Sequence, residues 1–137
     1  FLSIDETSSI HERLTVPVKE TLNTSGLLFY AWVVPYGIGL IVFLLIYSKF
    51  LLNLPKKTMI LFIVSGSIYI GGAIGFELLG GQQAEKAGAN DLLYSFFYTC
   101  EELLEMLGIA LFIYALLTYL VNKFQVMRIN IVNDSIE

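Results

Sequence analysis

One stretch of this chain, residues 94–121, constrains the fold more than any other, because it is apolar over the length of a membrane-spanning helix. Its apolar part, residues 103–121, is long enough to cross a hydrocarbon core of about 30 Å at about 1.5 Å per residue. Three carboxylates, Glu101, Glu102 and Glu105, lie at or just inside its start. A carboxylate at the bilayer centre costs about 2.5 to 3.5 kcal/mol. We therefore expect these acids to lie at the membrane boundary, to be protonated or to meet partners.

The whole chain has the composition of an integral membrane protein. Of its 137 residues, 56% are hydrophobic and only 15% are charged, which is too apolar for a water-soluble domain of this size. The net charge of −4, with no basic stripe, argues against nucleic acid as a partner. Cys100 is the only cysteine, so the chain can form no internal disulfide and no cysteine-based zinc site.

The sequence predicts an all-α membrane bundle that forms a single domain over residues 1–137. Three spans are expected, at about residues 26–52, 58–79 and 92–121. Pro35 predicts a kink in the first span, Gly80-Gly81 predicts the end of the second, and Asn90 or Asp91 can cap the third. A further span upstream of Phe1 is an open alternative.

The two ends of the chain are predicted to lie outside the spans. Residues 3–15 predict an amphipathic surface helix that ends before Val16-Pro17, and Ser3 and Glu6 have the spacing of a capping box. Residues 122–137 form a short tail whose apolar part is either strand-like or interfacial. The surface helix should therefore rest on the membrane beside the first span.

Small residues in the second span predict a close helix–helix contact. Ser67, Gly71 and Gly75 recur every four residues and so share one helix face. A ridge of this kind lets a second helix approach closely. The contact can form within the chain, with another membrane subunit or with a second copy in a homo-oligomer.

The positive charges near the spans predict the orientation. Lys49, Lys56, Lys57, Lys123 and Arg128 lie at one end of the bundle, and Arg13, Lys19 and Lys86 lie at the other. The positive-inside rule therefore places the Lys56-Lys57 turn and the tail in the cytoplasm. Residues 1–25 and 80–91 are then non-cytoplasmic.

This topology brings a histidine and several carboxylates to the same side of the membrane. The residues predicted to form a polar site there are Asp5, His11, Glu12, Glu77, Glu101 and Glu105. Carboxylates and an imidazole from different helices are the usual ligands of a metal site in a helical bundle. The leading hypothesis is therefore a site that binds a cation, such as a divalent metal ion, or relays protons.

The lone histidine limits the chemistry of such a site. Di-iron bundles use two Glu-x-x-His pairs, and zinc hydrolases use more nitrogen ligands. A mixed His/carboxylate site, an oxygen-only site for Ca²⁺, Mg²⁺ or Mn²⁺, and a proton relay without metal all remain open. No nucleophile and base pair can be recognised, so the sequence leaves open whether the protein is an enzyme.

Structural explanations compete with this hypothesis. Helix capping explains the acids near the N-terminus, and simple placement at the lipid headgroups explains Glu101 and Glu102. The second functional hypothesis is a non-catalytic accessory or scaffold subunit of a larger membrane complex, for example a pigment-binding or redox complex. In that case the acids would cap helices, pair with basic residues of a partner or ligate a pigment's metal.

Two short motifs resemble those of a known group of proteins. Leu2-Ser-Ile-Asp-Glu-Thr-Ser-Ser-Ile-His-Glu12, together with Glu101-Glu-Leu-Leu-Glu-Met-Leu-Gly108, is similar to a pattern in uncharacterised bacterial polytopic membrane proteins. In those proteins the first motif follows an earlier spanning helix. The resemblance implies only that residues upstream of Phe1 are missing from this sequence, and it implies no activity.

Overall fold

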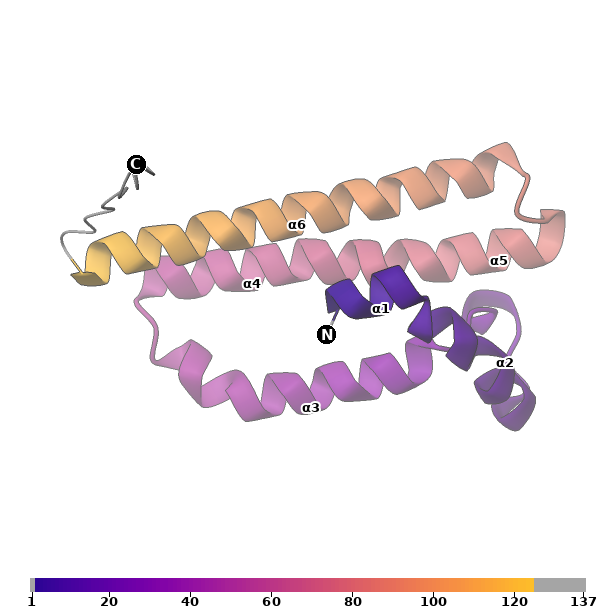
Figure 1. The fold of residues 1–137 in the computed structure, drawn as a ribbon, viewed down its shortest axis with the longest axis horizontal. Helices are drawn as coiled ribbons and strands as arrows, with labels where there is room; N and C mark the ends of the chain where they lie inside the picture. Colours follow the sequence, from indigo (N-terminus) through magenta and orange to yellow (C-terminus); the bar gives the residue numbers. More distant parts are fainter. Residues whose placement is uncertain (1, 125–137) are drawn as a thin grey trace, which may run out of the picture.

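The computed structural model describes residues 2–124, apart from the side chains of Leu2, Ser3, Glu6 and Glu12. Within this part of the chain every regular element is a helix (Figure 1). The helices are α1 (Leu2–Ser8), α2 (Ile10–Leu22), the 3₁₀ helix η1 (Gly26–Leu28), α3 (Val33–Leu52), α4 (Lys56–Ile70), the π-helix η2 (Gly71–Phe76), α5 (Glu77–Ala87) and α6 (Leu92–Phe124). The predicted all-α fold is confirmed.

Three continuous helices are long and apolar enough to cross a membrane. They are α3, the unbroken run Lys56–Ala87 formed by α4, η2 and α5, and α6. The second and third contain 32 and 33 residues, or about 50 Å at about 1.5 Å per residue, whereas a hydrocarbon core is about 30 Å thick. Helix α4 packs against α6, and α5 forms a helical hairpin with the start of α6 (Figure 1).

The second long helix does not end at Gly80-Gly81, as the sequence predicted. Both glycines are buried inside α5. A Cβ at Gly80 would lie 3.7 Å from the ring of Tyr94, and one at Gly81 would lie 2.9 Å from the ring of Tyr30. These glycines therefore serve close packing, and the helix ends instead at Gly88, whose φ of 86° favours glycine.

The N-terminal segment forms two helices where one was predicted. The chain turns at Ser9, which has a φ of 48°, and α2 then continues through Pro17 to Leu22. The expectation that the helix ends before Pro17 was therefore wrong. The proline removes a single helical hydrogen bond in a mostly exposed helix, which evidently tolerates the loss. The predicted capping box of Ser3 and Glu6 lies outside the described side chains.

The first span begins later than predicted. Residues 26–28 form η1, and α3 itself begins at Val33. Pro35 therefore lies in the first turn of α3, where its missing N–H has no helical partner to lose and no mid-span kink results. At the other end of the chain, α6 extends to Phe124, and the predicted tail beyond it lies outside the described residues.

Helices α4 and α6 pack through glycines on both sides. A Cβ at Gly108 of α6 would lie 2.8 Å from the backbone nitrogen of Tyr69, and one at Gly72 of η2 would lie 2.8 Å from the carbonyl oxygen of Glu101. In contrast, a Cβ at Gly71 or Gly75 would meet no atom within 4 Å. The predicted Ser67/Gly71/Gly75 ridge therefore does not form this contact, and its use by another subunit remains a prediction.

The π-helix η2 sits between α4 and α5. A π-turn accommodates one more residue than an α-turn, which rotates the residues that follow it around the helix axis. Up to η2 the residues that face α6 follow at intervals of three and four, and they include Phe62, Ser65, Tyr69 and Gly72. After η2, Gly80 packs against α6. Glu77 instead accepts a hydrogen bond from Trp32, which precedes α3.

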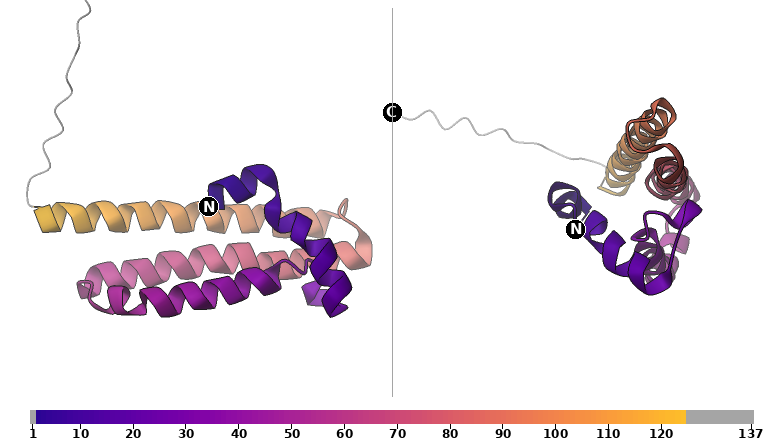
Figure 2. Two further views of the ribbon diagram at one scale, coloured as in Figure 1. Left: turned by 60° about the horizontal axis from the view of Figure 1, so that its bottom comes forward. Right: turned by 90° about the vertical axis from the view of Figure 1, so that its right-hand side faces the viewer.

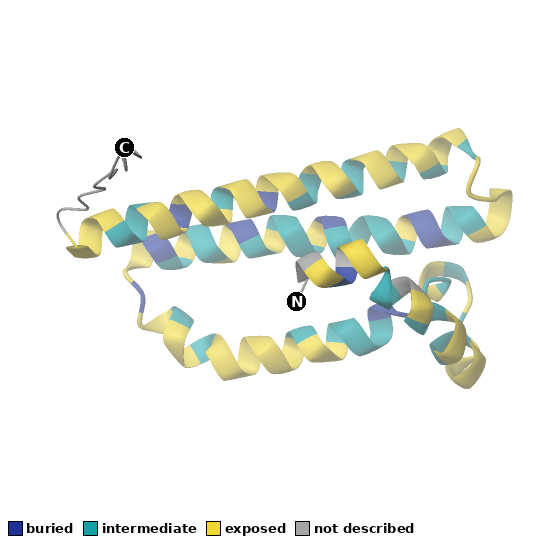
Figure 3. Cartoon of the chain, in the orientation of Figure 1, coloured by how far each residue is buried: buried dark blue, intermediate teal, exposed yellow. Residues whose placement is uncertain are grey.

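Helix α3 makes few contacts with the α4–α6 pair and is separated from it in Figure 1, and Figure 2 gives two further views of the same arrangement. Its residues are largely exposed along its length (Figure 3). The buried residues Ala31, Trp32 and Val33 lie at its start. There the N-terminal segment is tied to α5, since the backbone N–H of Gly26 donates to Glu85 Oε2 at 2.6 Å. The best-packed part of the N-terminal half is therefore the junction of α1, α2, α3 and α5.

Candidate functional site

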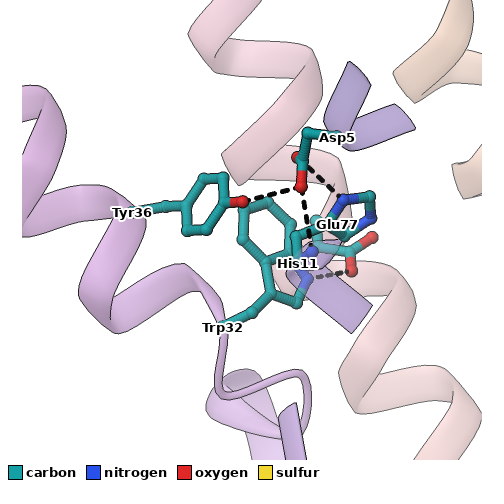
Figure 4. Close-up of polar contacts among 5 residues, drawn as sticks. All are labelled: Asp5, His11, Trp32, Tyr36 and Glu77. Carbon is teal, nitrogen blue, oxygen red and sulfur yellow. Dashed lines mark hydrogen bonds and ion pairs between the residues drawn. The ribbon is translucent and has the colours of Figure 1, made fainter. Parts of the chain in front are cut away.

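A polar cluster occupies this junction (Figure 4). We define it as Asp5 of α1, His11 of α2, Trp32 and Tyr36 at the start of α3, and Glu77 at the start of α5. Three separate parts of the chain thus contribute to it. The cluster lies at one boundary of the predicted hydrocarbon layer, because α3 begins there and the apolar run of α4 and η2 ends there.

Asp5 is the centre of the cluster and is only 5% exposed. Its carboxylate accepts three hydrogen bonds: from the backbone N–H of His11 at 3.0 Å, from the His11 ring through Nδ1 at 3.0 Å, and from the Tyr36 hydroxyl at 2.7 Å. A buried carboxylate is tolerated when donors of this kind replace water. The same contacts fix the corner between α1 and α2 and hold it against α3.

His11 lies between the carboxylate and an aromatic wall. Its ring centroid is 4.9 Å from that of Trp32 and 6.4 Å from that of Tyr36. The side chain is 17% exposed, so it retains some access to solvent. Because Asp5 accepts at Nδ1, the neutral ring carries its proton on Nδ1 in this arrangement, and Nε2 is left as the basic nitrogen.

Glu77 joins the cluster through the indole of Trp32 (Figure 4). Trp32 Nε1–H donates to Glu77 Oε1 at 2.9 Å. Trp32 and Tyr36 are four residues apart on one face of α3, with ring centroids 5.0 Å apart. Trp32 therefore contacts His11 with its ring and Glu77 with its N–H, and so connects α2 to α5.

The structure brings together three of the six residues predicted from the sequence, Asp5, His11 and Glu77. Glu101 and Glu105 lie half-buried on the face of α6 that packs against Gly72 of η2. The Glu12 side chain lies outside the described ones. Within the described residues, no group of three or more His, Cys, Asp or Glu side chains is arranged to hold a metal ion.

Two members of the cluster, Trp32 and Tyr36, were not predicted from the sequence. Their spacing of four residues at the start of a span was the available signal, because it places two side-chain donors on one face toward the acidic end of the bundle. Both donors face carboxylates, Tyr36 toward Asp5 and Trp32 toward Glu77. Aromatic residues at a membrane boundary are common for other reasons, which hid this role.

The arrangement can bind a proton but cannot conduct one through Trp32. The Asp5–His11 pair gains a full ion pair when the imidazole is protonated. The indole N–H can only donate a hydrogen bond and has no lone pair with which to accept a proton. Trp32 therefore cannot pass a proton between Glu77 and the Asp5–His11 pair.

Comparison with known proteins matches the chain to a protein family. The model of a protein family described as Domain of unknown function (DUF8692) matches residues 1–120, a range that includes the whole polar cluster and almost all of α6. No curated protein and no solved structure shows significant similarity to the chain.

Proposed function

The chain belongs to the family described as Domain of unknown function (DUF8692), and we propose from its geometry that it is an integral membrane protein that binds a proton at the Asp5–His11 pair. The observation that carries the proposal is the 3.0 Å contact between a nearly buried carboxylate and the chain's only histidine. Histidine is the side chain whose ordinary titration falls between pH 5 and 8.

Proton uptake would act on the attachment of the N-terminal helices. Protonation of His11 converts a neutral imidazole beside Asp5 into a cation, which strengthens the contact that holds the α1–α2 corner. Because Tyr36 lies in α3 and Trp32 is the residue that precedes it, the change affects the start of a span. We therefore propose a pH-responsive site on the predicted non-cytoplasmic side.

The chain contains one histidine and one tryptophan, in contact with each other, so tryptophan fluorescence can test the proposal directly. A protonated imidazole near an indole quenches its emission. We expect the emission of Trp32 to fall as the pH is lowered from 8 to 5, the range in which histidine gains its charge. The purified full chain in neutral lipid nanodiscs is the sample, and His11→Gln should abolish the change.

Glu77 supplies the control, because its carboxylate also touches Trp32. The proposal expects Glu77→Gln to retain the pH response of the fluorescence. If His11→Gln still responds and Glu77→Gln does not, the proton binds at Glu77 and the assignment to the Asp5–His11 pair is wrong. Circular dichroism of both variants would show that the helices remain folded.

A divalent metal ion remains a second possible ligand for the cluster. Asp5 would contribute a carboxylate oxygen and His11 would contribute Nε2. Elemental analysis of the purified chain tests this. If the purified chain carries a stoichiometric metal ion and His11→Gln loses it, the cluster binds a metal cation and not a proton.

An accessory role in a larger membrane complex is the second candidate function. The observation in its favour is α3, which makes no extended contact with another described helix and exposes apolar side chains along its length. Spans of multi-subunit complexes commonly complete their packing with partner helices. Purification in mild detergent separates the candidates, because a subunit would elute with partners of defined stoichiometry.

A further inference from the structure

A basic cavity lies at the opposite end of the bundle from the polar cluster. It has a volume of about 480 Å³ and is formed where the turn between α3 and α4 meets the end of α6. Its walls are made by Pro55, Lys56, Lys57, Thr58, Tyr119, Asn122 and Lys123. Neither the proton site nor the packing of α4 against α6 accounts for three lysines around one hollow.

Among the described residues at this end of the bundle, the cavity carries positive charge and no negative charge. Residues 49–76 and 106–124, which supply all the spanning segments at this end, contain four lysines and no aspartate or glutamate. Lys123 contacts only neutral groups in the described structure, with its Nζ 3.2 Å from the Tyr119 hydroxyl. The charges of the cavity therefore add to one another.

The position of two of these lysines is unfavourable for the helix alone. Lys56 and Lys57 form the first turn of α4, where the helix dipole is already positive. The cap residue is Pro55, which makes no side-chain hydrogen bond to the first backbone N–H groups. A bound anion would offset the repulsion and accept hydrogen bonds from these N–H groups. A local conflict of this kind marks a functional site more often than an accident.

We propose that this cavity binds the phosphate headgroup of an anionic membrane phospholipid. Phosphate is the anion for which a helix N-terminus flanked by lysines is suited. A lipid is its source because the cavity lies at the ends of apolar spans, beside exposed apolar side chains such as Leu52 and Val121 that would contact acyl chains. Basic pockets between spanning helices recognise headgroups in this way.

Selectivity for phosphatidylglycerol over phosphatidylcholine tests the proposal. The full chain is placed in phosphatidylcholine nanodiscs that contain spin-labelled phosphatidylglycerol, and electron spin resonance measures the immobilised lipid. Each lysine near an anionic lipid contributes about 1 kcal/mol, which is about fivefold in affinity. We expect Lys123→Gln to lower the selectivity about fivefold, and the joint change of Lys56, Lys57 and Lys123 to Gln to abolish it.

Lys49 provides a matched control. It lies at the same end of the bundle but does not line the cavity. The proposal expects Lys49→Gln to keep the selectivity and the joint change of Lys56, Lys57 and Lys123 to Arg to keep most of it. Equal losses in Lys49→Gln and the joint Gln variant would overturn the proposal, since general surface charge would then explain the binding. Full displacement of the lipid by inorganic phosphate would overturn the assignment to a lipid in favour of a soluble anion.

Discussion

Asp5 shows how a single buried charge can organise three helices. Its carboxylate accepts hydrogen bonds from His11, within α2, and from Tyr36, within α3. Hydrogen bonds to a charged group each contribute about 1.5 to 3 kcal/mol, and loss of one partner leaves a buried charge partly unsatisfied. The contacts that would bind a proton are thus the same contacts that hold α1 in place.

Removal of the Tyr36 hydroxyl should loosen α1 without disturbing the spans. Tyr36→Phe deletes one donor to Asp5 and should weaken the attachment of residues 2–11 by about 1 to 3 kcal/mol. Hydrogen exchange followed by mass spectrometry should show faster exchange there and no change in the α4–α6 pair. The control is Tyr47→Phe, an exposed tyrosine on the same helix. Equal exchange in the two variants would contradict this role of Tyr36.

At this scale the sequence predicted the acidic and imidazole members of the cluster but not its aromatic members. Asp5, His11 and Glu77 could be brought together because topology alone places them at one membrane boundary. The contact of Tyr36 with Asp5 depends on the turn at Ser9, and no residue pattern predicted the left-handed conformation of Ser9. The two carboxylates could therefore be predicted from the sequence, but the aromatic side chains that donate hydrogen bonds to them could not.

Between whole helices, the α4–α6 contact depends on which glycine faces the neighbour. Gly71 and Gly72 are adjacent in sequence, yet a Cβ at Gly72 would lie 2.8 Å from a backbone oxygen of α6 and one at Gly71 would meet nothing within 4 Å. Most side chains in a span are apolar, so hydropathy does not distinguish the face that meets another helix from the face that meets lipid. For this reason the spans could be predicted and the contact ridge could not.

This difference predicts that alanine has unequal effects at the two adjacent glycines, so that Gly71 serves as the control for Gly72. Gly72→Ala should destabilise the protein by about 1 to 3 kcal/mol, because backbone atoms of α6 must move to admit the methyl group. Gly71→Ala should be neutral or slightly stabilising, since alanine is the better helix former. Thermal unfolding in detergent, followed by circular dichroism, measures both. Similar melting temperatures for the two variants would argue against the close contact at Gly72.

The molecule as a whole is polarised along its length. The polar cluster and the α5–α6 hairpin lie toward one end, and the basic cavity lies at the other. This polarity follows from the sequence, because the charges flank the apolar runs. The extent of the hairpin does not follow from it, since Gly80-Gly81 resembles a helix end and only packing against Tyr30 and Tyr94 shows otherwise.

The orientation of this polarity can be tested with single cysteines. In a Cys100→Ser background, Asn90→Cys places a thiol in the exposed turn before α6, and Asn53→Cys places one in the exposed turn between α3 and α4. The positive-inside rule expects a membrane-impermeant maleimide to label position 90 in intact cells and position 53 only after permeabilisation. The reverse pattern would place the polar cluster in the cytoplasm.

The π-helix η2 sets the phase between the two ends of the long middle helix. Deleting one residue there would restore regular α-helix and turn everything after it by about 100°. Glu77 would then leave Trp32, and Gly81 would leave Tyr30, while the contact between Gly108 and Tyr69 stayed in register. One additional residue in η2 is thus enough to direct the Glu77 carboxylate toward Trp32 at the start of α3. The geometry of the polar cluster therefore depends on the number of residues in one helical turn as well as on the identity of its side chains.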